Sequence, residues 1–144
     1  MRGDFTKDIL ANKSLIKAAD LAVLEGDYYK AADYYKSQAD WATGNGLMRH
    51  STKPYLFKAT LCYLAVDLVQ AAKVIEEYLK IGTPGDESEL NFLRGLLDSI
   101  ENKSSEDFTA QVAMYRQKRA LDDWQEETLK IASHGLEGPV DDFA

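Results

Sequence analysis

A spacing of forty residues constrains this chain more than any other feature of its sequence. Residues 19–32 are echoed by residues 59–72, with small, apolar and acidic residues at matching positions. The matched residues are Ala19, Leu21, Leu24, Asp27, Ala31 and Ala32, which return as Ala59, Leu61, Leu64, Asp67, Ala71 and Ala72. Such a period, with small residues at helical positions, is typical of stacked helix pairs. The echo therefore predicts an array that offers surfaces to partners and not a closed active-site pocket.

Cap residues and breaks set the expected bounds of the first two helices. The first helix is expected to begin near Asn12, as N-cap, and to stop at Gly26. Asp27 is then expected to cap the second helix, which ends before the loop at residues 43–46. Its apolar face follows the spacing of an amphipathic helix. That stripe consists of Tyr28, Ala31, Ala32, Tyr35 and Ala39.

The third and fourth helices are expected to form the second hairpin. Pro54 suits the first turn of the third helix, which runs to Val66, because the missing N–H costs nothing there. The fourth helix runs to Ile81 and repeats the stripe of the second. The repeated stripe consists of Leu68, Ala71, Ala72, Ile75 and Leu79. Its alanines are expected to let two helices approach closely.

The second half of the chain predicts three more helices. Residues 82–85 form a break, after which Asp86 and Glu89 are placed as a capping pair for a fifth helix. The cap of the sixth helix is expected at Ser104 or Ser105.

A seventh helix follows, and Leu121 and Trp124 are expected to pack it onto the sixth. No stretch shows sustained strand alternation. The sequence thus predicts an all-α protein, a right-handed tetratricopeptide-like array of antiparallel helical hairpins that ends in a C-terminal helical bundle. Residues 1–136 are expected to form this array and residues 137–144 a flexible acidic tail.

Charge is distributed unevenly along the chain. Residues 1–85 hold 11 basic and 10 acidic residues, whereas residues 86–144 hold 6 and 14. An acidic balance argues against nucleic acid as a partner, since duplex binding needs a basic stripe. The acidic second part is expected to attract a basic protein partner, or simply to serve as a solvated face.

The chemistry-bearing residues do not indicate an enzyme. The histidines, His50 and His134, stand near predicted helix ends without a nucleophile motif, and no cofactor or metal site is expected. The single Cys62 lies in an apolar run, which indicates an inert core thiol and a reducing compartment. No run approaches the roughly 20 apolar residues that span a bilayer. We therefore expect a cytoplasmic protein.

Three segments in order resemble one known family. They are residues 11–18 in the first helix, residues 51–62 around the start of the third, and Leu121-Asp122-Asp123-Trp124, followed by an acidic tail with a penultimate hydrophobe. Together they resemble the C-terminal half of the alpha-SNAP family, the soluble attachment proteins for the N-ethylmaleimide-sensitive fusion ATPase (NSF). The resemblance runs from about Ile9 to the end. It implies an adaptor that binds assembled SNARE four-helix bundles, then recruits and stimulates the hexameric ATPase that disassembles them. Its membrane association would be peripheral, through these partners.

The resemblance also implies which residues meet each partner. ATPase contacts would be made by acidic residues and by a tail hydrophobe: Asp67, Asp98, Glu101, Asp122, Asp141, Asp142 and Phe143. For Asp67 the echo leaves a second interpretation open, since it matches Asp27 and is then a helix cap. SNARE contacts would come from a basic surface comprising Lys13, Lys17, Lys53 and Lys58, although helical lysines are often only solubilising.

An alternative function stays open. A tetratricopeptide-like scaffold would bind an extended peptide of another partner in its groove. A site for a peptide carboxylate needs Lys, Arg and Asn side chains that converge on the inner face. The sequence shows no clear set of this kind.

Overall fold

The computed structural model describes residues 2–81 and 87–136, with the backbone alone at residues 2–10 and 12. All regular structure in these ranges is helical, as the sequence predicts. Two short 3₁₀ helices, η1 and η2, accompany the α-helices. In chain order the elements are α1 (Arg2–Leu24), α2 (Tyr28–Thr43), η1 (Gly46–Ser51), α3 (Thr52–Val66), α4 (Leu68–Ile81), α5 (Ser88–Glu101), α6 (Ser105–Lys118), α7 (Asp123–Ser133) and η2 (His134–Leu136).

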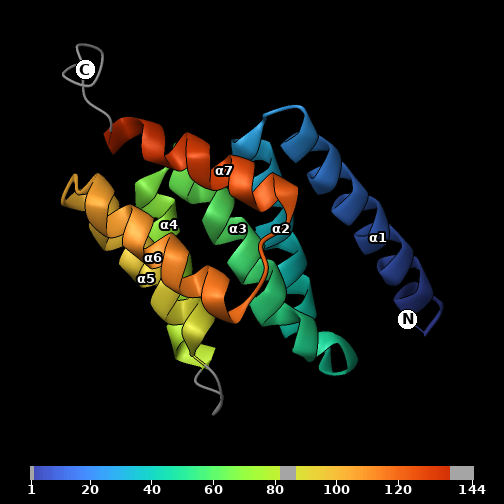
Figure 1. The fold of residues 1–144 in the computed structure, drawn as a ribbon. Coiled ribbons are helices and arrows are strands. Elements are labelled where there is room, and N and C mark those ends of the chain that lie inside the picture. Colours follow the sequence, from blue (N-terminus) through green and yellow to red (C-terminus); the bar gives the residue numbers. More distant parts are fainter. Residues whose placement is uncertain (1, 82–86, 137–144) are drawn as a thin grey trace.

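Consecutive helices pack as hairpins, α1 with α2, α3 with α4 and α5 with α6 (Figure 1). The turns inside these hairpins are short: residues 25–27, the single residue Asp67, and residues 102–104. Turns of this length leave the second helix of each pair no course but to fold back along the first. The three turns therefore lie at one end of the array, called the turn end below, and η1 lies at the other.

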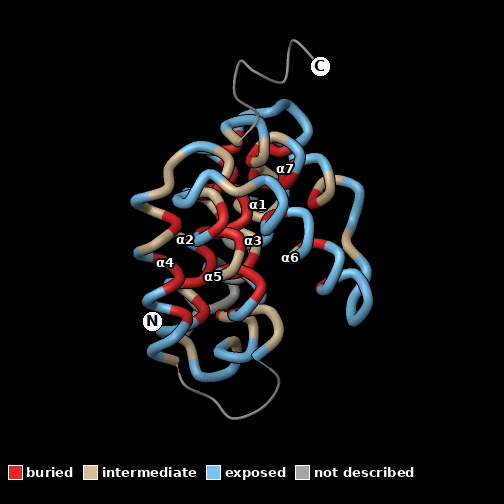
Figure 2. Tube along the Cα trace, turned by 60° about the vertical axis from the view of Figure 1, so that its left-hand side comes forward, coloured by how far each residue is buried: buried red, intermediate tan, exposed pale blue. Residues whose placement is uncertain are grey.

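Helix α3 is the centre of the molecule. It packs against α2, α4, α5 and α7, and Figure 2 shows the buried segments gathered inside the array. A helix that is apolar on all sides has to be covered on all sides. Its buried residues are Thr52, Leu56, Phe57, Ala59, Thr60, Leu61, Cys62, Tyr63 and Leu64. Burial raises the pKa of the Cys62 thiol to about 12, so the predicted inert core cysteine is confirmed.

Local signals for helix starts are confirmed at two positions. The carboxylate of Asp27 accepts a hydrogen bond from a backbone N–H in the first turn of α2 at 3.1 Å. The hydroxyl of Ser104 does the same for α6, also at 3.1 Å. The predicted capping pair of α5 includes Asp86, which lies outside the described residues. Glu89 instead accepts a hydrogen bond at 3.0 Å from the hydroxyl of Tyr78, on α4.

The predicted start of the first helix is wrong. Helix α1 begins at Arg2 and passes through Asn12, which is an interior residue and not an N-cap. Asparagine costs a helix interior only about 0.5 kcal/mol relative to alanine. The helix formers before it, among them Lys7, Leu10 and Ala11, allow the helix to continue.

The predicted stripe on α2 is buried throughout, but the one on α4 is wrong toward its end. Leu79 is exposed and Tyr78 is buried in its place, together with Val74. Ala72 is only half-buried. Tyr78 lies on the side of α4 that meets α5, where its hydroxyl reaches Glu89. The buried face of α4 is therefore turned by one position relative to the predicted stripe.

The predicted packing of the last helix onto α6 is also wrong. Helix α7 packs against α3, and the ring of Trp124 stacks on Tyr35 of α2 with centroids 6.0 Å apart. A groove of about 570 Å³ lies between α6 and α7, bridged by the ion pair of Arg116 with Glu126. That pair holds the pKa of the Glu126 carboxyl below its usual value. The apolar surface of α3 is the larger one to cover, which explains why α7 lies on it.

Candidate protein-interaction surfaces

Asp67 forms the turn between α3 and α4 and makes two contacts there. One carboxylate oxygen accepts a hydrogen bond from the backbone N–H of Gln70, at 3.2 Å, and so caps α4. The other accepts a hydrogen bond from the hydroxyl of Tyr29 on α2, at 2.9 Å. This second bond raises the pKa of Tyr29. The cap interpretation of Asp67 is thus confirmed. The same residue also links the α3–α4 turn to α2 of the first hairpin.

Asp98 and Glu101 lie exposed in the last turn of α5. The next helix begins beside them with Glu106 and Asp107, also exposed, in its first turn. Acidic side chains are favoured there because the N-terminus of a helix carries partial positive charge. The α5–α6 turn therefore presents four carboxylates from two helices. The sequence alone would have added Glu106 and Asp107, since the Ser104 cap already places both in the first turn.

Asp122 lies apart from that group. It is the N-cap of α7, with a capping box in which its backbone N–H donates to the Gln125 side chain at 3.0 Å. Figure 1 shows the start of α7 and the α5–α6 turn on opposite sides of the molecule. Asp122 therefore does not join the carboxylates at the α5–α6 turn. The predicted tail contacts Asp141, Asp142 and Phe143 lie outside the described residues.

Lys13, Lys17 and Asp20 follow one another at helical spacing on a single exposed face of α1. Lys58 joins this face from α3. Its ammonium lies 5.6 Å from the centre of the Tyr35 ring, and the Tyr35 hydroxyl donates a 2.6 Å hydrogen bond to Asp20. The structure thus relates three of the four predicted lysines to one surface.

The fourth predicted lysine, Lys53, belongs to a different cluster. Its ammonium lies 5.7 Å from the centre of the Tyr78 ring. With Arg49, His50 and Ile81 it lines a pocket of about 640 Å³. Sequence reasoning missed Arg49 and His50, because nothing in the sequence indicated that residues 46–51 would form η1 and turn them toward α3.

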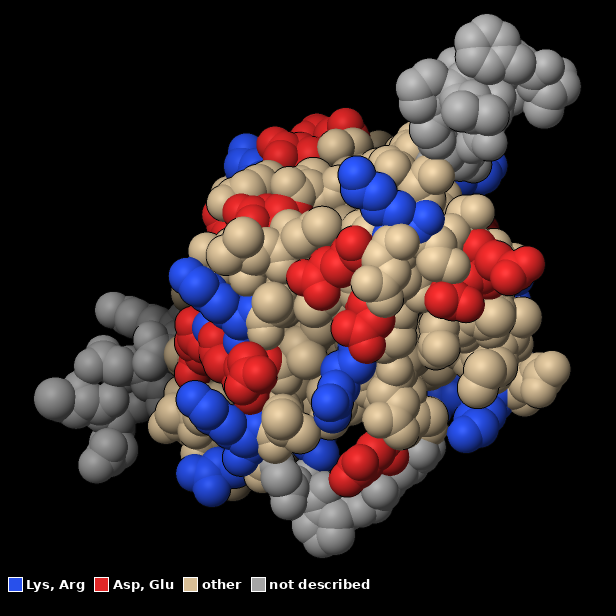
Figure 3. Space-filling model, turned by 90° about the vertical axis from the view of Figure 1, so that its left-hand side faces the viewer, with Lys and Arg blue, Asp and Glu red and all other residues tan. Residues whose placement is uncertain are grey.

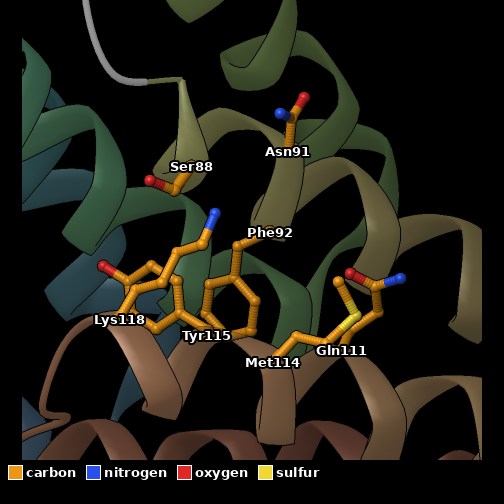
Figure 4. Close-up of a pocket in the computed structure, with 7 residues that line it drawn as sticks. All are labelled: Ser88, Asn91, Phe92, Gln111, Met114, Tyr115 and Lys118. Carbon is orange, nitrogen blue, oxygen red and sulfur yellow. The ribbon is translucent and has the colours of Figure 1, made fainter.

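A smaller pocket of about 130 Å³ lies between α5 and α6 (Figure 4). The rings of Phe92 and Tyr115 form a close stack there, with centroids 4.2 Å apart. The ammonium of Lys118 lies above the two rings, on the side of Ser88. One helix turn away, a Cβ at Gly95 would come within 2.5 Å of the Gln111 side chain. This is the geometry of two closely packed helices.

Charge on the outer face is dispersed. Figure 3 views the molecule from the left of Figure 1, and there the acidic side chains form small separate groups with Lys and Arg between them. Within the described ranges, no three His, Cys, Asp or Glu side chains are grouped so that they could hold a metal ion. None of the helices there is both long and apolar enough to cross a membrane.

These features define a class of protein, the arrays of antiparallel helical hairpins with charged outer surfaces. A family model described as soluble NSF attachment protein, SNAP, matches residues 4–136. The chain belongs to this family, as the three segments of the sequence predict.

Named relatives agree with the family model. The chain is 36% identical over 137 residues to a probable vesicular-fusion protein sec17 homolog of Neurospora crassa, covering 94% of this chain and 47% of the relative. It is 33% identical to the alpha-soluble NSF attachment protein of Saccharomyces cerevisiae, covering 93% and 47%. For the human alpha-soluble NSF attachment protein the identity is 30%, covering 92% and 45%. The chain thus spans about half the length of the relatives that it matches.

Proposed function

We propose that this chain is an adaptor in vesicle trafficking that binds SNARE complexes and recruits and stimulates an NSF-type ATPase for their disassembly. The adaptor hydrolyses nothing itself and works in the cytoplasm, held at membranes only through its partners. The observation that carries the proposal is the turn end of a SNAP-family array. There Asp67 and the four carboxylates of the α5–α6 turn stand on turns that emerge on the same side of the array.

The ATPase half of the proposal rests on charge. Clustered carboxylates steer a basic partner toward the turn end and raise the rate of association. In the charge test, Asp98→Lys with Glu101→Lys is titrated against the isolated N-terminal domain of an NSF-type ATPase. We expect weaker binding, mostly through slower association, and a smaller difference at high salt.

The matched control places the same change of charge elsewhere. Glu76→Lys with Glu87→Lys alters net charge equally but away from the turn end, on the body of α4 and just before the start of α5. If both double variants lose the same affinity, overall charge and not the turn end governs binding. If neither loses affinity at low salt, Asp98 and Glu101 do not belong to the interface.

The SNARE half of the proposal rests on the lysine face of α1 and α3. We expect Lys13→Ala with Lys17→Ala to weaken binding of an assembled SNARE bundle, and Lys58→Ala to act in the same direction. Lys53→Ala tests the separate cluster around η1 independently. Full retention of the bundle by both the Lys13→Ala/Lys17→Ala variant and Lys58→Ala would remove this face from the interface.

The tail contributes stimulation in this proposal. Asp141, Asp142 and Phe143 remain predictions, in which the acidic residues attract the ATPase and the aromatic ring is buried on it. Deleting residues 141–144 is expected to leave the melting temperature of the array unchanged while ATP hydrolysis by the partner rises less. Because this chain spans about half the length of its relatives, the deletion is also made in a full-length relative, where an unchanged disassembly rate would contradict the role of the tail.

A second candidate function is favoured by one observation. Arg49, His50 and Lys53 converge on a pocket that also has apolar lining, which is the kind of set that a peptide carboxylate needs. A scaffold that binds an extended peptide by its C-terminus is the alternative role. Peptides with a free carboxylate would then bind more tightly than the same peptides amidated, and Arg49→Ala would abolish the difference. Equal binding of both forms would eliminate the alternative.

A further inference from the structure

A groove of about 750 Å³ lies where the end of α1, the end of α3 and α7 come together. Figure 1 shows the C-terminal end of α1 beside α7. This groove is called the α1–α7 groove below. Leu24, Val66, Trp124 and Ile131 supply its apolar lining. Leu24 and Val66 are exposed although they are aliphatic, so part of the groove is an uncovered apolar surface.

The two hairpins show that this surface lacks a cover that its counterpart has. Leu24 and Leu64 stand forty residues apart at the same position of the echo, yet Leu24 is 79% exposed and Leu64 is 3% exposed. Helix α3, which carries Leu64, is covered by α7 in addition to its neighbouring hairpins. Among the helices described, the strongest packing partner of α1 is α2. An apolar position that is buried in one repeat is therefore open in the other.

The charges around the groove indicate what can cover it. Three carboxylates, Glu25, Asp123 and Glu127, stand among its lining residues, and the described lining includes no cation. An apolar floor with an acidic rim complements an apolar side chain that is flanked by Lys or Arg. A second copy of this chain is a poor fit. A two-fold contact would set this acidic rim against itself.

The groove is continuous with the turn end. Glu25 belongs to the α1–α2 turn, and Val66 directly precedes Asp67. A partner that docks at the α3–α4 turn, beside Asp67, would therefore lie next to the groove.

We propose that the α1–α7 groove receives an apolar side chain from a basic segment of the ATPase N-terminal domain. Docking then combines charge contacts, which steer the encounter, with an apolar anchor at Leu24, which slows dissociation. This inference rests on the proposed function and adds to it a specific contact that carries no charge.

The test compares two exposed leucines. Leu24→Ser removes the anchor, and Leu47→Ser is the matched control, because Leu47 is 76% exposed and lies on η1 at the opposite end of the array. Each variant of this chain is titrated against the isolated ATPase N-terminal domain. We expect the Kd of Leu24→Ser to rise about 10-fold and that of Leu47→Ser to stay within about two-fold. Equal melting temperatures would establish that both variants are folded.

Salt separates the anchor from the charges. Raising ionic strength from about 0.1 M to about 1 M shortens the screening length from about 10 Å to about 3 Å. The fold-change for Leu24→Ser should persist, because burial of an apolar group is not screened. The effect of replacing Glu25 and Glu127 by Gln should shrink. A Leu24→Ser effect that disappears with salt would overturn the anchor.

The remaining outcomes distinguish this inference from the function on which it rests. If the unsubstituted chain binds the ATPase domain and Leu24→Ser binds equally well, the groove is not an anchor and the proposed function stands. If the unsubstituted chain does not bind, both fail. The last measurement is the oligomeric state of the chain alone, determined by sedimentation. If the chain forms a dimer that Leu24→Ser dissociates, the groove binds a second copy and the proposal is overturned.

Discussion

The α1–α2 and α3–α4 hairpins carry the same residues at matching positions but place them in different surroundings. Leu61 is fully buried, whereas Leu21, its counterpart in the echo, is 57% exposed. The alanines that face the partner helix differ less, because Ala31, Ala32 and Ala71 are fully buried and only Ala72 is partly open. Contacts inside a hairpin are thus repeated, and contacts between hairpins are not.

The difference indicates how this array is built. A hairpin specifies its own inner seam through small residues, and the repeat preserves that seam. The outer face of the first helix of each pair depends on what comes to lie against it. In the second hairpin α7 and α5 lie there, and this makes α3 the core of the molecule.

The pair Leu61 and Leu21 gives the largest expected effect on stability. Leu61→Ala should lower the free energy of unfolding by about 2 to 5 kcal/mol, because it leaves a cavity in the core. Leu21→Ala should change it by no more than about 0.5 kcal/mol. Chemical denaturation of both variants measures the two values. Similar losses would mean that the first hairpin is covered as fully as the second.

The alanine pair tests the inner seams. Ala32→Leu forces extra volume into a fully buried contact and should cost about 1 to 3 kcal/mol. Ala72→Leu should cost less, since Ala72 is only half-buried. Melting temperatures of the two variants give the order, and the reverse order would contradict the rotated face of α4.

The aspartate pair separates capping from cross-linking. Asp27→Ala removes one cap and should cost about 1 kcal/mol. Asp67→Ala removes a cap and also the hydrogen bond from Tyr29, so it should cost more than Asp27→Ala. A double-mutant cycle with Tyr29→Phe isolates the second contribution. No coupling between Asp67 and Tyr29 would mean that the two turns are not tied.

Tyr63 gives the smallest expected difference in stability between the two hairpins, and this difference depends on pH. Its counterpart in the first hairpin is Val23. Burial, followed by the hydrogen bond to Asp33, raises the pKa of Tyr63 above its usual value. The unfolded chain therefore loses this proton first, near pH 10, and stability falls as pH rises from there toward the folded pKa. The free energy of unfolding, measured from about pH 9 to about pH 11, should decline less steeply with pH in Tyr63→Phe than in the unsubstituted chain. Parallel curves would contradict the raised pKa of Tyr63.

Local sequence determined the parts of this protein that depend on neighbours within one or two helix turns. The caps at Asp27 and Ser104 follow from side chains that reach their own backbone, and the stripe on α2 follows from helical spacing. The SNAP-family resemblance was readable for the same reason, as its segments are local patterns. Asp67 was predicted as a cap or as an ATPase contact, and its capping bond belongs to this local class.

Tertiary structure alone decided what lies across the chain from each residue. Leu24 and Leu64 occupy matching positions of the echo, but the helices packed around α3 leave Leu64 buried, whereas Leu24 on α1 stays exposed. The separation of Lys53 from Lys58 likewise depends on which neighbour each meets, Tyr78 of α4 or Tyr35 of α2. Burial and surface charge are set by elements far apart along the chain. The forty-residue echo by itself does not predict them, because it repeats the hairpin and not its surroundings.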